Sequence, residues 1–295
     1  MGATSLPAPT PVLTLIYGLT CALFYGSADY AGGRASRTTS SISVTASSQI
    51  FGSMLVLALV PFLGGRGPTP RALFIGGLGG VCGAVGLLLL YRALSLAAMS
   101  VVSPITAVLS AVVPVVAGVI IGEGLTATHA IGVALALTAI ALVSRGGDDA
   151  HDAQEHHRRP SVSLFATSFI AGIFFGLFVV ALDRAGDDVG VWPLVTAKPV
   201  GVAFAVAVAV SRRVGPIVPR RALGLTLAAG AADMTANVFA TLSAQAGQVA
   251  IAGVLVSLYP ASTVVLARFV DHEKITRPQL IGFAIAVAAL VLIAI

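Results

Sequence analysis

The sequence predicts an all-α integral membrane protein with ten transmembrane helices, arranged as two inverted five-helix repeats. Three observations support this fold class: an apolar composition, ten apolar segments, and short strings that recur 150 residues apart. Of the 295 residues, 57% are hydrophobic and only 10% are charged, with a mean hydropathy of +0.98. A water-soluble fold cannot hide that much apolar surface, whereas lipid accepts it because a helix satisfies its own backbone hydrogen bonds.

Ten segments are long and apolar enough to be membrane spans, since a helix needs about 20 mostly apolar residues to cross the hydrocarbon core. The first segment is expected to be a retained span, because the preceding MGATSLPAPTP lacks the basic region of a secretory signal. The predicted spans are 12–32, 42–64, 72–95, 98–121, 127–144, 162–182, 191–210, 222–244, 248–270 and 279–295.

The polar string RGGDDAHDAQEHHRRP at 145–160 lies at the middle of the chain. Its charge and its lack of apolar residues are typical of a flexible linker. We therefore expect a first five-helix repeat at 1–144, a linker at 145–160, and a second five-helix repeat at 161–295. The linker contains histidine and acidic residues but no fixed ligand spacing, so we expect no metal site there.

The two halves match each other at a constant offset of 150 residues, which indicates an internal repeat. Because each unit has an odd number of spans, the second unit must enter the membrane in the opposite sense. Inverted repeats of this kind place a binding site near the midplane, between the halves. The matching strings are Phe24–Gly26 with Phe174–Gly176, Arg71–Leu73 with Arg221–Leu223, Glu123 and Thr126 with Glu273 and Thr276, and Ile131–Gly132 with Ile281–Gly282.

Three strings in the first half, at 91–95 (YRALS), 122–126 (GEGLT) and 131–132 (IG), resemble the repeat signature of EamA-type drug/metabolite transporters. The second half is similar, with Pro260 thirteen residues before Glu273, although the first half has Ser110 at the matching place. The resemblance covers essentially the whole chain. It implies a ten-helix exporter or importer of small metabolites. Our own expectation is an exporter of an amino acid or a related polar or amphiphilic solute.

Ionisable residues inside predicted spans are candidate functional groups, because an unpaired charge in the membrane costs several kcal/mol. Asp29, Lys198 and Asp233 are the three that stand out. Asp233 and Asn237 are four residues apart, hence on one helical face, where a carboxylate and an amide suit binding of an amine or a hydroxyl. A buried carboxylate of this kind can also exchange a proton, so we expect possible coupling to protons and no bound cofactor.

Each of these residues also has a structural interpretation. Asp233 and Lys198 could simply neutralise each other, and Lys198 is long enough to reach the interface. Asp29 lies near a span end, where it could contact lipid headgroups or pair with Arg34. Pro199 removes one helical hydrogen bond and favours an interrupted helix of the kind that lines transporter sites.

Three tyrosines fall in segments that the resemblance places around a central cavity, and their rings and hydroxyls could bind a solute. The alternative is that they are interfacial anchors, as Trp192 is expected to be. We therefore predict seven substrate-binding residues and no catalytic residue: Tyr25, Asp29, Tyr91, Lys198, Asp233, Asn237 and Tyr259.

Two other function classes compete with a secondary transporter. Asp29 and Asp233 could form an aspartyl-protease dyad, but the chain lacks the Tyr-Asp and Gly-x-Gly-Asp strings of intramembrane proteases, and it has no GxSxG or HExxH. A scaffold or channel subunit would explain the packing but not the intramembrane charges. No P-loop is present, so we expect transport without ATP hydrolysis.

The net charge of +5 does not indicate a nucleic-acid partner, because the arginines lie in short turns between apolar segments. We expect the partners to be a small solute and membrane lipid, the chain to be a monomer or homodimer, and the location to be a bacterial cytoplasmic (inner) membrane.

The orientation of the termini receives two opposite indications. The family resemblance implies a cytoplasmic N-terminus, which we take as the expectation, whereas the positive-inside rule favours both termini outside. The arginines behind the second indication follow odd-numbered spans: Arg34, Arg37, Arg158, Arg159, Arg212, Arg213, Arg220 and Arg221.

Overall fold

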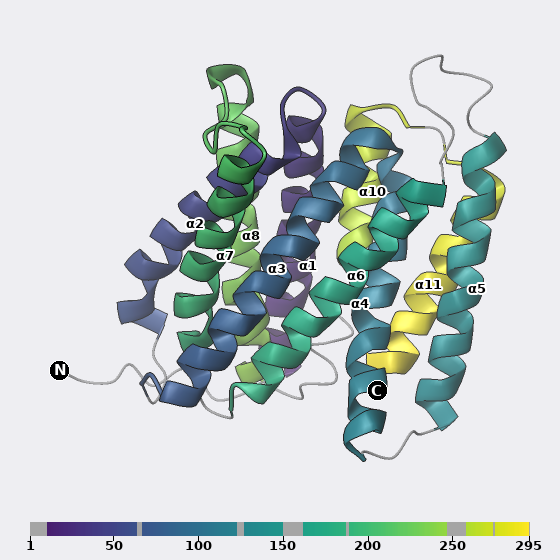
Figure 1. The fold of residues 1–295 in the computed structure, drawn as a ribbon. Helices are drawn as coiled ribbons and strands as arrows, with labels where there is room; N and C mark the ends of the chain where they lie inside the picture. Colours follow the sequence, from purple (N-terminus) through teal and green to yellow (C-terminus); the bar gives the residue numbers. More distant parts are fainter. Residues whose placement is uncertain are drawn as a thin grey trace.

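The computed structural model describes residues 11–63, 67–122, 127–149, 162–186, 189–246, 258–273 and 275–294. Within these ranges the secondary structure is helical throughout, and Figure 1 shows the helices side by side in one bundle. The helices are α1 (Pro11–Ser36), α2 (Ser41–Leu63), α3 (Pro70–Leu96), α4 (Met99–Ile121), α5 (Ala127–Asp149), α6 (Val162–Arg184), α7 (Trp192–Ser211), α8 (Arg220–Ala246), α10 (Tyr259–Val270) and α11 (Arg277–Ala294).

Each predicted span corresponds to a helix, with two differences in extent. Helix α5 continues to Asp149, so the first residues of the expected linker are helical. The span expected at 248–270 contains α10 in its second half, and 247–257 lies outside the described residues. Six helices are long and apolar enough to cross a membrane by themselves: α2, α3, α4, α6, α7 and α8.

Local sequence signals explain where α3 and α4 begin and end. The Thr69 hydroxyl accepts the Ala72 amide at 3.1 Å, and Pro70 follows at the first helical position, where its missing N–H costs nothing. Gly122 ends α4 in the left-handed region at φ 96°, a conformation that glycine adopts without a steric penalty.

The two halves run in opposite directions. Gly33, near the end of α1, packs on Leu94, near the end of α3, so these two helices run in parallel. At the start of α3, Arg71 Nε donates to the carbonyl of Arg184 at the end of α6, at 3.1 Å. Helices α3 and α6 are therefore antiparallel, and so are α1 and α6, which occupy the same place in their repeats (Figure 1).

The packing pairs obey the same internal symmetry. Helix α1 packs on α8 and α10, just as α6 packs on α3 and α4, while α2 packs on α7 and α5 on α11. The equivalent arginines make similar contacts: Arg221 donates to the carbonyl of Thr38 just beyond α1 at 3.1 Å, and Arg71 donates to the carbonyl of Arg184 at the end of α6 at 3.1 Å. Interchange of the halves therefore reproduces the arrangement of the bundle.

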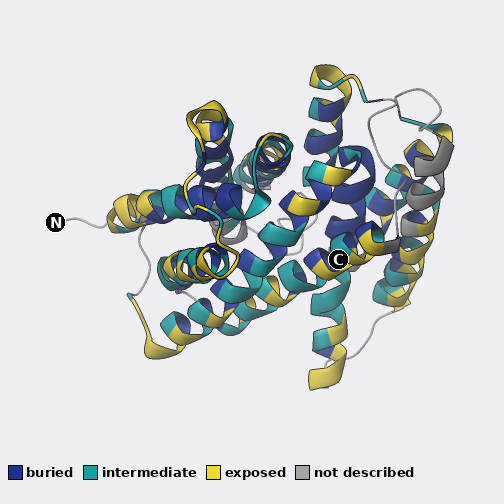
Figure 2. Ribbon diagram, turned by 45° about the horizontal axis from the view of Figure 1, so that its top comes forward, coloured by how far each residue is buried: buried dark blue, intermediate teal, exposed yellow. Residues whose placement is uncertain are grey.

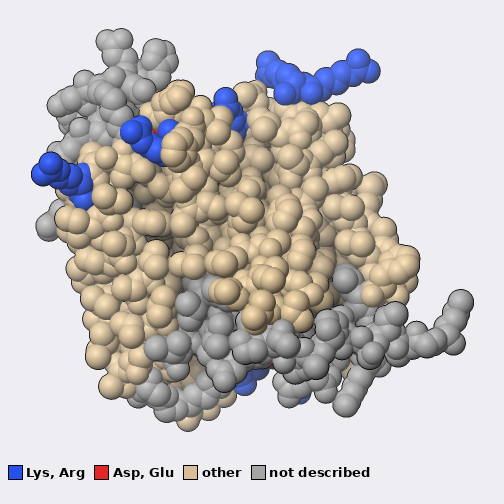
Figure 3. Space-filling model, turned by 180° about the vertical axis from the view of Figure 1, so that it is seen from behind, with Lys and Arg blue, Asp and Glu red and all other residues tan. Residues whose placement is uncertain are grey.

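The outer surface is apolar, as a lipid-facing surface requires. Large exposed side chains include Phe62, Phe74, Ile120 and Phe269, each at least 69% exposed. Figure 2 shows the exposed positions on outward faces and at helix ends, with the buried positions inside. On the face shown in Figure 3, Lys and Arg lie towards the two ends of the molecule, and the broad band between them is uncharged.

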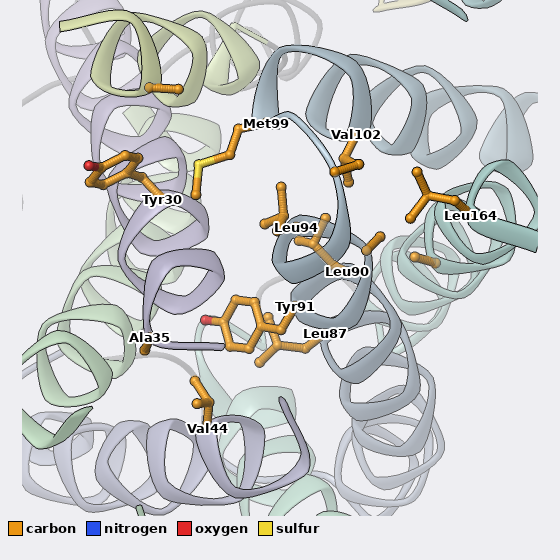
Figure 4. Close-up of a cluster of buried hydrophobic side chains, with 14 of the residues drawn as sticks. Tyr30, Ala35, Val44, Leu87, Leu90, Tyr91, Leu94, Met99, Val102 and Leu164 are labelled. Carbon is orange, nitrogen blue, oxygen red and sulfur yellow. The ribbon is translucent and has the colours of Figure 1, made fainter. Parts of the chain in front are cut away.

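Hydrophobic clusters fill the interior of the bundle, and glycines allow the helix backbones to approach closely. Figure 4 shows the largest cluster, in which Tyr91, Leu94 and Met99 of α3 and α4 meet Tyr30 of α1. A Cβ atom on Gly80 of α3 would lie 2.2 Å from the carbonyl oxygen of Ala197 in α7. Small residues allow this backbone approach, which membrane helices use to gain packing.

Gly80→Ala is predicted to lower the free energy of unfolding by about 1–3 kcal/mol, because the added methyl group meets backbone that cannot move aside. Gly77→Ala in the same helix is the matched control, since its Cβ would lie 3.7 Å from Val200, an ordinary contact distance. Thermal unfolding of the purified protein in detergent measures both changes. Equal midpoints for the two variants would contradict the close α3–α7 approach.

Candidate functional site

A buried ion pair joins the middle of α7 to the middle of α8. Lys198 Nζ donates to Asp233 Oδ2, and the two side chains are only 7% and 19% exposed. Removing two charges from water is costly, and their close contact offsets part of that cost. The sequence identified both residues and named their pairing as one interpretation, and the structure shows that pairing.

Gln49 of α2 is a third member of this group, which sequence reasoning missed. Its Oε1 accepts from Lys198 Nζ at 3.5 Å, and the residue is 6% exposed. Gly201, one turn after Lys198, makes room for the amide, because a Cβ there would lie 3.1 Å from Gln49 Nε2. A glutamine inside an apolar span was the available signal, by the same cost argument that singled out the charged residues.

Asn237 lies one turn beyond Asp233, as its spacing predicted. Its Nδ2 donates to the Asp233 carbonyl oxygen at 2.7 Å and lies 3.5 Å from the Oδ1 of the same residue. The amide therefore orients the carboxylate on the side away from Lys198. Asp233 thus has a cation on one oxygen and an amide near the other.

Asp29 of α1 is a second buried carboxylate near this pair, and it is 8% exposed. Helix α1 packs on α8, the helix that bears Asp233. Among the described residues, no hydrogen bond or ion pair to the Asp29 carboxylate is found. The alternatives of a lipid-headgroup contact or a pair with Arg34 are wrong, because Asp29 is buried and Arg34 Nη1 lies 2.7 Å from Asp271 Oδ1.

Tyr25 and Tyr259 meet edge to face, with ring centroids 6.1 Å apart and an interplanar angle of 61°. Tyr25 lies one turn before Asp29 in α1, and Tyr259 begins α10. Thr263, one turn after Tyr259, donates to the Gly26 carbonyl next to Tyr25 at 3.2 Å. These two tyrosines therefore meet where α1 packs on α10, and their role as solute ligands stays a prediction.

Tyr91 differs from the other two tyrosines because its side chain is completely buried in the hydrophobic cluster (Figure 4). Its ring fills the space beside Gly32 of α1, where a Cβ would lie 2.1 Å from the ring. Asp29 and Asp233 still act on its hydroxyl electrostatically. Tyr91 packs α3 against α1 behind the charged groups.

Pro199 does not interrupt its helix, contrary to the expectation from the sequence. Helix α7 is one element from Trp192 to Ser211, with Pro199 inside it. Neighbouring helices α2 and α3 pack on α7 and hold its axis, so the single missing hydrogen bond is tolerated. The Lys198 side chain therefore projects from an unbroken helix.

The polar region is chemically asymmetric although the fold is symmetric. Its residues come from α1, α2, α7, α8 and α10, and the positions 150 residues away in the other repeat are small or apolar. In place of Tyr25, Asp29, Asp233, Asn237 and Tyr259, the matching positions carry Phe175, Val179, Gly83, Leu87 and Leu109. The two repeats therefore contribute different side chains to this site.

Comparison with known proteins places the chain in a family. The sequence profile of the EamA-like transporter family matches twice, at residues 12–145 and 162–295. The chain belongs to this family of membrane transporters, which is part of the drug/metabolite transporter superfamily. The search of curated proteins found no match.

A solved structure described only as the crystal structure of a protein is similar to this chain over 96% of both chains, with a TM-score of 0.61 and 17% identity. At that identity the similarity concerns the fold alone.

A double-mutant cycle is expected to show that Lys198 and Asp233 stabilise each other. Lys198→Met leaves a buried carboxylate unpaired and should destabilise the protein by about 3–5 kcal/mol, whereas the double variant Lys198→Met/Asp233→Leu should recover most of the loss. The single variant Asp233→Leu completes the cycle. Thermal unfolding in detergent measures these three variants against the native protein. Additive losses in the double variant would show that the two residues do not interact.

Proposed function

We propose that the protein is a secondary transporter that carries a small zwitterionic metabolite, such as an amino acid, by alternating access between its two repeats. The observation that carries this proposal is the Lys198–Asp233 pair, buried in the apolar bundle with Gln49 and Asn237 beside it. Ionisable groups at membrane depth are typical of solute or ion pathways. Apolar side chains could hold the helices together at a lower free-energy cost than a buried ion pair.

The chemistry of the pair suits a solute with one positive and one negative group. An amine can replace Lys198 at the Asp233 carboxylate, while a solute carboxylate takes the ammonium group of Lys198. Lys198 and Asp233 then each keep an opposite charge as partner. Binding of the solute therefore adds no unpaired buried charge to the protein. The edges of Tyr25 and Tyr259 provide an aromatic surface for the remainder of the solute.

The fold supports alternating access because equivalent helices of the two halves make equivalent packing contacts. An inverted repeat has two related conformations, each open to one side, around a site that stays near the midplane. Ten membrane crossings, a bacterial inner membrane and export are parts of the same proposal. The direction of transport is tested by uptake into inside-out vesicles, in which export from the cell becomes accumulation.

A protease mechanism receives no support from the geometry. An aspartyl dyad requires two carboxylates that share one proton. Here Asp233 Oδ2 contacts Lys198 Nζ, so its charge is already balanced, and the carboxylate of Asp29 has a different environment. The two residues have the separate roles of a solute ligand and a second titratable group.

We further propose that Asp29 carries the coupling proton. Its carboxylate is buried and has no counter-ion among the described residues, and the neighbouring titratable groups are Tyr25, Tyr91, Tyr259 and Asp233. Without a cation, an anion at this position is stable only when water enters. Opening of the site would therefore release the proton, and closure would require it.

Asp233→Asn should abolish solute transport, because the amide cannot hold an amine and leaves Lys198 unpaired. The measurement is counterflow of each radiolabelled amino acid in turn into proteoliposomes. Size-exclusion chromatography checks folding, and Lys198→Met/Asp233→Leu repeats the test without an unpaired charge. Asp183→Asn is the control, since that side chain is 73% exposed at the end of α6. Undiminished counterflow in both site variants would refute the site assignment.

Asp29→Asn should separate exchange from coupling. Accumulation driven by a pH gradient should disappear, because the amide carries no exchangeable proton, while solute counterflow at equal pH should continue at a similar rate. Both quantities are measured in the same proteoliposomes, with the native protein as reference. Accumulation that still follows the pH gradient in the variant would assign the proton to another group.

A further inference from the structure

Four charged residues form a cluster at one end of the bundle, outside the site described above. Arg34 and Arg37 lie at the end of α1 and in the turn that follows, and Asp271 and Glu273 follow α10. Arg34 Nη1 lies 2.7 Å from Asp271 Oδ1, Arg37 Nη1 lies 3.2 Å from Asp271 Oδ2, and Arg37 Nη2 lies 3.3 Å from Glu273 Oε1. We call these four residues the charge cluster.

The charge cluster is more than a set of surface ion pairs, because its acidic members are largely shielded. The side chains of Asp271 and Glu273 are only 12% and 13% exposed, and that of Arg37 is 22% exposed. Tyr30 also donates to Asp271 Oδ1, at 3.1 Å. Exposed pairs contribute little, whereas connected and partly buried charges interact through fewer water molecules.

Glu273 additionally binds the first turn of α4. Its two carboxylate oxygens accept the backbone amides of Met99 at 3.0 Å and Ser100 at 3.2 Å. Amides at a helix N-terminus have no partner within the helix, and the helix dipole favours a negative charge there. A carboxylate from the second repeat therefore caps a helix of the first repeat.

Arg37 completes the connection through α3. Its Nε donates to the carbonyl of Leu94 at 3.3 Å, close to the end of α3. The charge cluster thus joins α1, α3 and α4 of the first repeat to α10 of the second at one end of the bundle. Deeper between α1 and α10, Thr263 Oγ1 donates to the Gly26 carbonyl at 3.2 Å, so these two helices are also in contact below the cluster.

The sequence cannot form the same arrangement at the opposite end. The residues 150 positions away from Arg37 and Asp271 are Asp187 and Ile121, so the central arginine is replaced by an acid and its aspartate by an apolar residue. The counterparts of Arg34 and Glu273, which are Arg184 and Glu123, keep their charge. The two ends of the symmetric bundle therefore carry different side chains. An arginine–aspartate pair like Arg37–Asp271 can form only at the end that bears the charge cluster.

We propose that the charge cluster is a gate, which holds this end of the bundle closed and separates when the end opens. Separation moves Glu273 away from both Arg37 and the α4 amides, so the contacts between the repeats at this end break together. The gate rests on the alternating access proposed above. Its test needs no transported solute, so it can fail while transport is confirmed, or succeed while transport is not found.

The native cysteines provide the reporter for this test. Cys21 is fully buried and lies on the same face of α1 as Tyr25 and Asp29, at intervals of four residues. With Cys82→Ser as background, a membrane-impermeant maleimide reacts at Cys21 only when the bundle opens. Right-side-out and inside-out vesicles present the reagent to each end separately.

Asp271→Asn should raise the rate of Cys21 labelling by about fivefold or more from the side that bears the charge cluster, since couplings of this kind typically change populations by at least that factor. Glu273→Gln is the second variant, because it removes the charge but keeps an oxygen for the α4 amides. Asp183→Asn at the opposite end is the matched control and should label at the native rate.

Two results would overturn the gate. Labelling of Cys21 at the native rate in both Asp271→Asn and Glu273→Gln would show that the charge cluster does not limit opening. Faster labelling from both sides of the membrane would show a general loosening of the bundle. One-sided acceleration supports the proposal, and size-exclusion chromatography checks that each variant is folded.

Discussion

In a lipid-facing bundle, a charged group inside is stable only when another part of the protein neutralises it or when it is protonated, because lipid solvates no charge. This constraint explains the arrangement of the whole molecule. Apolar side chains face outward, and the serine and glutamine residues of α2 are buried inside. The most demanding case is the Lys198–Asp233 pair, which requires α7 and α8 to stay aligned. Helix α2 packs on both of them, and Gly201 of α7 and Gly230 of α8 allow its close approach.

A symmetric backbone with asymmetric chemistry is the second principle of this structure. The halves share their helix pairs, and Arg71 and Arg221 each donate to a carbonyl at or just beyond the end of a first helix. The counterparts of the charged site carry other residues, and so do those of Arg37 and Asp271 in the charge cluster. Symmetry of the backbone provides two related conformations, and asymmetry of the side chains gives the two ends different chemistry.

The fold was largely predictable from the sequence because its signals are local or periodic. Runs of apolar residues locate the helices, and the 150-residue offset indicates the inverted repeat without any distance information. The candidate site was predictable in part, since the cost of burying a charge singles out Asp29, Lys198 and Asp233. Gln49 was missed because a neutral amide in a span gives a weaker signal than a charge. The interruption expected at Pro199 was wrong, because α7 continues through it while α2 and α3 pack on that helix.

The sequence by itself determined the class of the protein, the number of apolar segments and the repeat, since composition and periodicity depend only on the order of residues. The tertiary structure decided which charges meet. Lys198 and Asp233 are 35 residues apart in the chain, and Arg37 is more than 230 residues from Asp271. A single sequence holds no record of such distances, because they depend on how the helices pack. The pairings between helices, and with them the site and the gate, therefore followed only from the folded bundle.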